Sequence, residues 1–170
     1  MTIRKPILCC LFFVLVSVSA NAQSTFEVPQ NVQLNSKEDY AKYETAIIDA
    51  AKWLEETDLD KETDKRKEVN SFVLQWISGS PTVTVDITKK LSKIYDKNIQ
   101  LLAIYLASYA RNFLENKNAA TKFSAVKAGL ISMMNVYKKQ IDISRSKEME
   151  KLIELTKDNK LDNYINKNFM

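Results

Sequence analysis

Four acidic residues at alternate positions form the first pattern in this chain that could bind a metal ion. They are Asp58, Asp60, Glu62 and Asp64, and they stand between two expected helices. Oxygen ligands at the first, third and fifth positions of a loop are typical of a calcium site. Such a loop also needs a glycine at its sixth position and a glutamate at its twelfth, where this chain has Thr63 and Val69. We therefore interpret the acidic residues as a solvated loop before a helix and predict no metal site.

Two serine–lysine pairs match the S-x-x-K pattern of penicillin-binding enzymes, in which the lysine helps to activate the serine. The pairs are Ser124 with Lys127 and Ser144 with Lys147. The partner motifs S-D-N and K-T-G are absent from the chain, and its length is too short for such an enzyme. We interpret both matches as chance and assign no catalytic residue to them.

A glycan hydrolase would need two carboxylates that face each other across a cleft. The densest acidic cluster beside an aromatic residue comprises Glu55, Glu56 and Asp58, close to Trp53. An aromatic ring beside acids can bind a sugar, but the same residues fit a helix end at which the indole packs inward. We expect the helix end and keep the hydrolase as the alternative function.

The first 22 residues have the three parts of a secretory signal peptide. Arg4 and Lys5 are basic, residues 7–18 are mostly apolar, and Ala20-Asn21-Ala22 offers small residues to a signal peptidase. A helix over residues 7–18 would be only ~18 Å long, which is too short for a hydrocarbon core of ~30 Å. We expect cleavage before Gln23 and export to the periplasm or the outside of the cell, with no membrane span in the remaining chain.

Composition excludes several classes of site. Both cysteines, Cys9 and Cys10, lie in the expected signal peptide, the chain has no histidine, and it has 2 glycines. Disulfide-linked partners, thiolate metal sites, serine–histidine triads and glycine-rich phosphate loops therefore drop out, and we predict no cofactor. Loss of Arg4 and Lys5 with the signal peptide lowers the formal net charge from +4 to +2. The remaining charges are interspersed, which argues against nucleic-acid binding.

Helical periodicity predicts one all-α domain over residues 36–170, an irregular antiparallel bundle of five to seven helices. Residues 23–35 are polar and lack periodicity, so we expect a flexible segment there. A first helix is expected over about 36–56. The helix expected over about 98–114 is apolar on most sides, which predicts a central position with Leu102 and Leu106 among the most buried residues.

Two features could bind a partner. Aromatic and arginine side chains are enriched at binding hot spots, and residues 82–86, which alternate threonine and valine, form a short extended segment that could accept an added strand. The candidate residues are Trp76, Thr82, Val83, Thr84, Val85, Tyr105, Tyr109 and Arg111. The alternative interpretations are core packing with the tyrosine hydroxyls at the rim, and a linker held across helix ends.

By elimination, we expect an exported, non-catalytic binding or scaffolding module of the cell envelope. Its partner would be an envelope protein or a glycan. The alternative function is a carboxylate-dependent hydrolase that acts on a glycan or cell-wall substrate.

Overall fold

The computed structural model describes residues 25–170, and the predicted signal peptide lies outside these residues. They form eight α-helices and one 3-10 turn, and no strand is present among them, so the all-α fold class is confirmed. The helices are α1 Lys37–Lys42, α2 Glu44–Glu56, α3 Thr63–Gly79, α4 Lys89–Tyr95, α5 Leu101–Asn116, α6 Lys122–Lys138, α7 Lys147–Lys157 and α8 Leu161–Phe169, and the turn is Lys117–Ala119. None of the helices in this part of the chain is long and apolar enough to cross a membrane.

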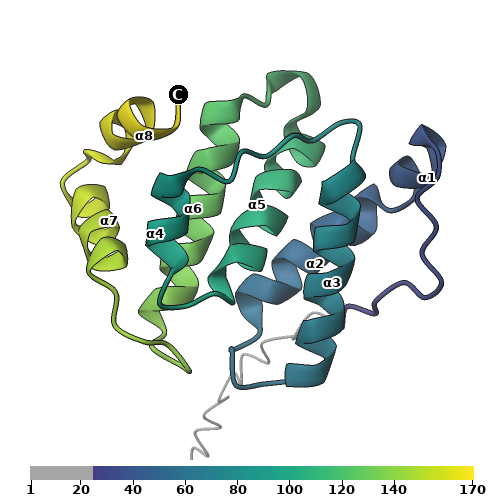
Figure 1. Ribbon diagram of the computed structural model, residues 1–170, viewed down its shortest axis with the longest axis horizontal. Helices are drawn as coiled ribbons and strands as arrows, with labels where there is room; N and C mark the ends of the chain where they lie inside the picture. Colours follow the sequence, from purple (N-terminus) through teal and green to yellow (C-terminus); the bar gives the residue numbers. More distant parts are fainter. Residues whose placement is uncertain (1–24) are drawn as a thin grey trace, which may run out of the picture.

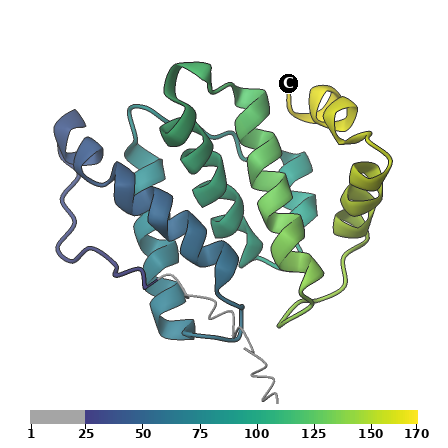
Figure 2. The ribbon, with the colours of Figure 1, turned by 180° about the vertical axis from the view of Figure 1, so that it is seen from behind.

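The predicted central helix is α5, which packs against α2, α3 and α6. Figure 1 shows α3 and α4 on the near side of α5, and Figure 2 shows α2 and α6 on the opposite side. Leu106 is 2% exposed, as predicted. Leu102 is only partly buried, which corrects that part of the prediction. Leu102 lies in the first turn of α5, one turn after the exposed Ile99, and so is nearer the end of the helix than Leu106.

The expected first helix is divided at Tyr43 into α1 and α2. Its start is confirmed, because Ser36 and Asp39 form a capping box. The Tyr40 carbonyl accepts the N–H of Tyr43 at 3.1 Å and the indole N–H of Trp76 at 3.0 Å. In an uninterrupted helix, that carbonyl would accept the N–H of Glu44. The tertiary hydrogen bond from Trp76 thus favours a break that periodicity does not reveal.

Residues 25–35 contain no helix or strand but touch the bundle. Phe26 is buried, and its ring lies 6.5 Å from the ring of Phe72 on α3. The flexibility expected for residues 23–35 stays a prediction, and Phe26 is the apolar contact that holds the described part of the segment to α3.

A close approach of α5 and α6 requires a glycine. A Cβ atom on Gly129 would lie 2.6 Å from Cδ2 of Tyr105 and 3.0 Å from its backbone oxygen. Real Cβ contacts are longer, so any larger residue would push the two helices apart. Gly129 therefore allows the buried Tyr105 ring to lie flat against α6.

Candidate functional site

The extended segment that joins α3 to α4 crosses α5 on the surface of the bundle (Figure 1). The Ser80 hydroxyl accepts the backbone N–H groups of Thr82 and Val83 at 3.3 and 3.2 Å. The hydroxyl of Tyr109, on α5, donates to the Thr84 carbonyl at 3.1 Å. The side chain of Val83, within the segment, is buried. These contacts hold the segment in place across the helices.

Beyond these anchors, the next four backbone N–H groups of the segment have no hydrogen-bond partner in the part of the chain that the structure describes. The N–H groups of Thr84, Val85, Asp86 and Ile87 form no hydrogen bond to any group in residues 25–170. Side-chain burial alternates along the strand-like stretch, with Val83 buried, Thr84 exposed, Val85 partly buried and Asp86 exposed. A fixed, extended backbone with unused donors is the arrangement of a sheet edge, which can pair with another chain.

An apolar pocket of about 280 Å³ adjoins this segment. Its lining residues come from α3, the segment and α5, and are Leu74, Ile77, Ser78, Ser80, Val83, Thr84, Val85, Ile87 and Leu106. Leu74 is 42% exposed and Ile87 is 53% exposed, so two large apolar side chains border the pocket in contact with solvent. The helix α4 begins at Lys89, so Ile87 belongs to the extended segment. We call the pocket and residues 83–87 together the edge groove.

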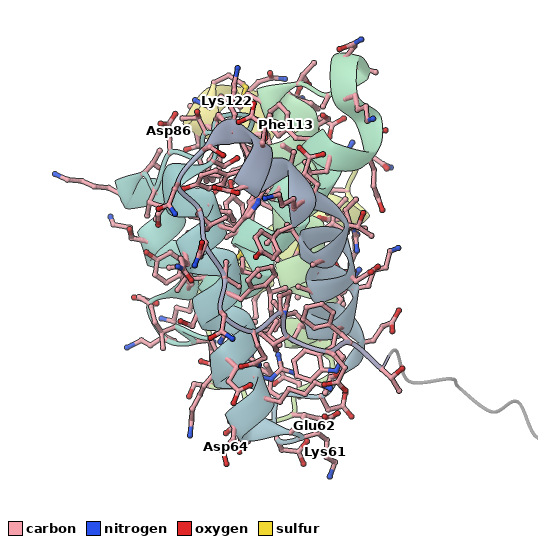
Figure 3. The ribbon with its side chains drawn as sticks, turned by 90° about the vertical axis from the view of Figure 1, so that its right-hand side faces the viewer. Lys61, Glu62, Asp64, Asp86, Phe113 and Lys122 are labelled. Atoms are coloured by element: carbon pink, nitrogen blue, oxygen red, sulfur yellow. The ribbon has the colours of Figure 1, made fainter. Side chains whose placement is uncertain are left out.

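A second cavity, of about 390 Å³, lies at the Thr82 end of the segment and is bordered by Glu44, Phe113, Leu114 and Lys117. Near the other end, Asp86 forms a 2.9 Å ion pair with Lys122 at the start of α6. Figure 3 shows Asp86, Phe113 and Lys122 at one end of the molecule, far from Lys61, Glu62 and Asp64 at the other. The segment therefore lies between two hollows, of which the first is apolar and the second carries charges of both signs.

The aromatic candidates are part of the core. Trp76, Tyr105 and Tyr109 are all buried, and the two tyrosine rings lie 6.0 Å apart. Burial raises the pKa of both phenols, so both stay protonated as hydrogen-bond donors. Only the Tyr109 hydroxyl reaches the candidate site, through its hydrogen bond to Thr84. This is the core arrangement with a hydroxyl at the rim that we gave as the alternative interpretation.

Arg111 belongs to a polar cluster between α2, α5 and α6 that the sequence does not reveal. Its guanidinium lies 3.3 Å from the carboxylate of Glu55 and 3.8 Å from that of Glu115. Glu55 also accepts hydrogen bonds from Ser108, at 2.6 Å, and from Ser132. Ser108 and Ser132 interrupt apolar runs, and that interruption is the only feature of the sequence that could have indicated this cluster. Because Glu55 already accepts hydrogen bonds from Ser108, Ser132 and Arg111, we interpret the cluster as a polar contact that joins three helices and not as a pair of hydrolytic carboxylates.

Trp53 and the acidic residues beside it also have contacts within the protein, with Arg66 and Lys139. Trp53 is buried, with the guanidinium of Arg66 5.2 Å from its ring centroid. Arg66 donates to the Thr57 carbonyl at 2.6 Å, and its burial lowers its pKa. Lys139 donates to the carbonyls of Glu55 and Glu56 at 3.1 and 3.0 Å. Lys139 thus satisfies the last two carbonyls of α2 and Arg66 that of the C-cap residue Thr57, as expected at a helix C-terminus.

The acidic residues of the loop before α3 point to separate lysines. The ion pairs are Asp58 with Lys139 at 3.0 Å, Asp60 with Lys61 at 3.3 Å, Glu62 with Lys65 at 3.5 Å and Asp64 with Lys67 at 2.8 Å. Among residues 25–170, no three acidic, histidine or cysteine side chains lie close enough to hold a metal ion. Each of the four carboxylates is thus oriented toward a different lysine.

The serine–lysine matches do not form a nucleophilic pair at Ser124. This serine completes the capping box of α6 with Thr121, and its hydroxyl donates to Asn112 at 2.7 Å. Lys127 instead forms a 2.6 Å ion pair with Asp162 on α8.

No family model, curated protein or solved structure with which the chain was compared matches it. A functional proposal therefore rests on the geometry of the described residues, and the edge groove offers the most specific geometry.

Proposed function

We propose that the protein is a non-catalytic binding module of the cell envelope and that it receives an extended peptide along residues 83–87. The observation that carries the proposal is the run of backbone N–H groups from Thr84 to Ile87 that have no partner among residues 25–170, beside an apolar pocket. These residues are exposed or only partly buried, and an accessible extended backbone with unpaired donors can pair with an incoming strand. Export, predicted from residues 1–22, would place this edge where envelope proteins are found.

The recognition would follow strand addition. Carbonyl groups of the peptide would accept the free N–H groups, and these main-chain bonds provide affinity for any extended sequence. Alternate side chains of a strand point to the same face, so every second residue of the peptide would face the bundle. A pocket of about 280 Å³ lined by Leu74, Ile77 and Leu106 suits a branched apolar side chain at one of those positions.

This function accounts for the groove better than the hydrolase does. The residues that line the apolar pocket include no carboxylate, and the Ser80 hydroxyl is already occupied by two backbone donors. A glycan partner would need polar groups that match its hydroxyls, whereas the pocket is lined mainly by leucine, isoleucine and valine. We therefore choose a peptide over a glycan as the partner.

The test is a binding titration with a fluorescein-labelled synthetic peptide of alternating threonine and valine and a central leucine. Wild-type residues 23–170 should bind it saturably. Leu74→Asp and Ile87→Asp should each lower the affinity at least tenfold, because a carboxylate would have to lose water in the apolar pocket. Both side chains are largely exposed, so the melting temperature should change little.

Ile99→Asp is the matched control, because Ile99 is 66% exposed and does not line the pocket. This variant should bind the peptide like the wild type. Equal loss of binding in all three variants would mean that the peptide adheres to exposed apolar surface in general. No binding by the wild type would also refute the proposal.

A further inference from the structure

The second cavity, at the Thr82 end of the segment, has the composition of a small-molecule site. Its volume of about 390 Å³ falls in the range of ~300–1,000 Å³ that is typical of ligand sites, which combine apolar walls with a few polar groups. Phe113 and Leu114 form its apolar part, and its polar residues are Thr82, Glu44 and Lys117. The cavity therefore offers apolar surface and one residue of each charge to a single ligand.

The apolar wall is held in place by its neighbours. The ring of Phe113 is only partly buried, and its centroid lies 5.4 Å from that of the buried Tyr109 ring. Leu114, the next residue on α5, is 8% exposed. Figure 3 shows Phe113 near one end of the molecule. A partly exposed aromatic ring that packs on a second ring can accept an apolar side chain of a ligand on its remaining surface.

The two charged residues come from the ends of different helices. Glu44 is the first residue of α2, and Lys117 directly follows the last residue of α5. Each charge is favourable at its own helix end, because a helix N-terminus attracts anions and a C-terminus attracts cations. Among residues 25–170, no ion pair within 4 Å joins Glu44 to Lys117, although both border the same cavity. The helix ends thus place opposite charges around the apolar wall without direct contact between them.

The backbone at Lys117 is strained. Its φ of 41° and ψ of −113° lie in a region that residues other than glycine seldom adopt. Its N–H donates to the carbonyl of Phe113, so the strained turn is tied to the residue that forms the apolar wall. Strain of this kind persists where the surrounding structure fixes it, and it is found often at ligand sites.

We propose that the second cavity binds a free α-amino acid with an apolar side chain. The ligand ammonium group would pair with Glu44, its carboxylate with Lys117, and its side chain would pack on Phe113 and Leu114. A zwitterion satisfies both protein charges at once, whereas a simple anion or cation would also face a like charge. This site goes beyond the proposed function, because the edge groove receives the main chain of a peptide along residues 83–87.

The test is a titration of residues 23–170 with L-phenylalanine, followed by calorimetry and by the chemical shifts of the Leu114 methyl groups. Saturable binding is expected with a dissociation constant of about 0.1–1 mM, as suits a ligand of this size. Glu44→Gln and Lys117→Gln should each weaken binding at least about fivefold, since each removes one charge-assisted hydrogen bond. Both variants should keep the circular dichroism of the wild type and its affinity for the labelled threonine–valine–leucine peptide.

The matched controls are Glu38→Gln and Lys97→Gln. Glu38 stands in the first turn of α1, as Glu44 does in α2, and Lys97 is exposed; neither borders the second cavity. Both control variants should bind L-phenylalanine like the wild type. Equal weakening in all four variants would show that the ligand responds only to the net charge of the protein, and would refute the site.

Two blocked ligands assign each charge to its partner. N-acetyl-L-phenylalanine lacks the ammonium group, so it should bind more weakly to the wild type and lose no further affinity in Glu44→Gln. L-phenylalanine amide lacks the carboxylate, so it should bind more weakly and lose no further affinity in Lys117→Gln. Such non-additive losses are expected when two groups contact each other directly.

Each contrary outcome overturns a stated part of the proposal. N-acetyl-L-phenylalanine that binds as tightly as the free amino acid would assign the cavity to the C-terminal residue of a peptide. L-phenylalanine amide that binds as tightly would assign it to an N-terminal residue. Absence of binding at about 10 mM L-phenylalanine, tenfold or more above the expected dissociation constant, would refute the site. Peptide binding at the edge groove is measured separately, so either proposal can fail alone.

Discussion

Replacement of Leu106 by alanine is expected to lower the free energy of unfolding by about 2–5 kcal/mol. Leu106 is 2% exposed and lies on α5, which contacts α2, α3 and α6, so the lost side chain would leave a void in the core next to the apolar pocket that Leu106 lines. Urea denaturation followed by circular dichroism at the helix band measures the change.

Leu102→Ala is the matched control for this variant, because Leu102 lies one turn earlier on α5 and is only partly buried. It should cost less than Leu106→Ala, since less apolar surface leaves the core. A change under about 0.5 kcal/mol for Leu106→Ala would mean that α5 is not the centre of the core.

The second large effect is expected for substitution of Trp76. Its cost in unfolding free energy tells whether Trp76 is a core residue or a binding hot spot. Trp76 is fully buried, and its indole N–H donates to the Tyr40 carbonyl at 3.0 Å. Trp76→Ala should cost about 3–5 kcal/mol of unfolding free energy. Trp76→Phe keeps most of the packing and loses the hydrogen bond, so it should cost clearly less. Thermal and urea denaturation of both variants check the order, and a negligible cost for Trp76→Ala would point to a surface role.

The helices could be predicted from the sequence because apolar spacing records which side of each helix is buried. The long apolar run in α5 indicated its central place. The break at Tyr43 was not predictable, because it depends on the indole of Trp76, which is distant in sequence and close in space. The partial exposure of Leu102, in the first turn of α5, was also not predicted, because apolar periodicity does not show how fully the end of a helix is covered.

The candidate site was only half visible in the sequence. The alternation of residues 82–86 indicated an extended segment, and the structure places that segment across α5. The apolar pocket combines residues of α3, the segment and α5, so neither Leu74 nor Ile87 stood out before these elements were brought together. Conversely, Trp76 and Tyr105 are of the residue types that are common at binding sites, but they lie in the core. Residue type alone does not distinguish a core aromatic residue from an interface one.

The polar cluster around Glu55 also could not be predicted from the sequence. Glu55 drew attention as part of an acidic group near Trp53, but its partners Ser108 and Ser132 lie on helices far along the chain. A carboxylate tied to two serines and Arg111 is satisfied inside the protein. Only the spatial arrangement separates such a group from a catalytic acid.

The central claim, that a peptide strand pairs with the free backbone of residues 84–87, is tested most directly by amide hydrogen exchange. In the free protein, the N–H groups of Thr84, Val85, Asp86 and Ile87 should exchange rapidly, because they have no partner in the described structure. With the threonine–valine–leucine peptide at saturation, at least two of these four should become protected, since alternate residues of a strand face the added chain. The amides in the last turn of α2, which lies on the opposite side of α5 from α3 and α4, serve as the internal reference. Bound peptide with unchanged exchange at all four positions would contradict strand pairing.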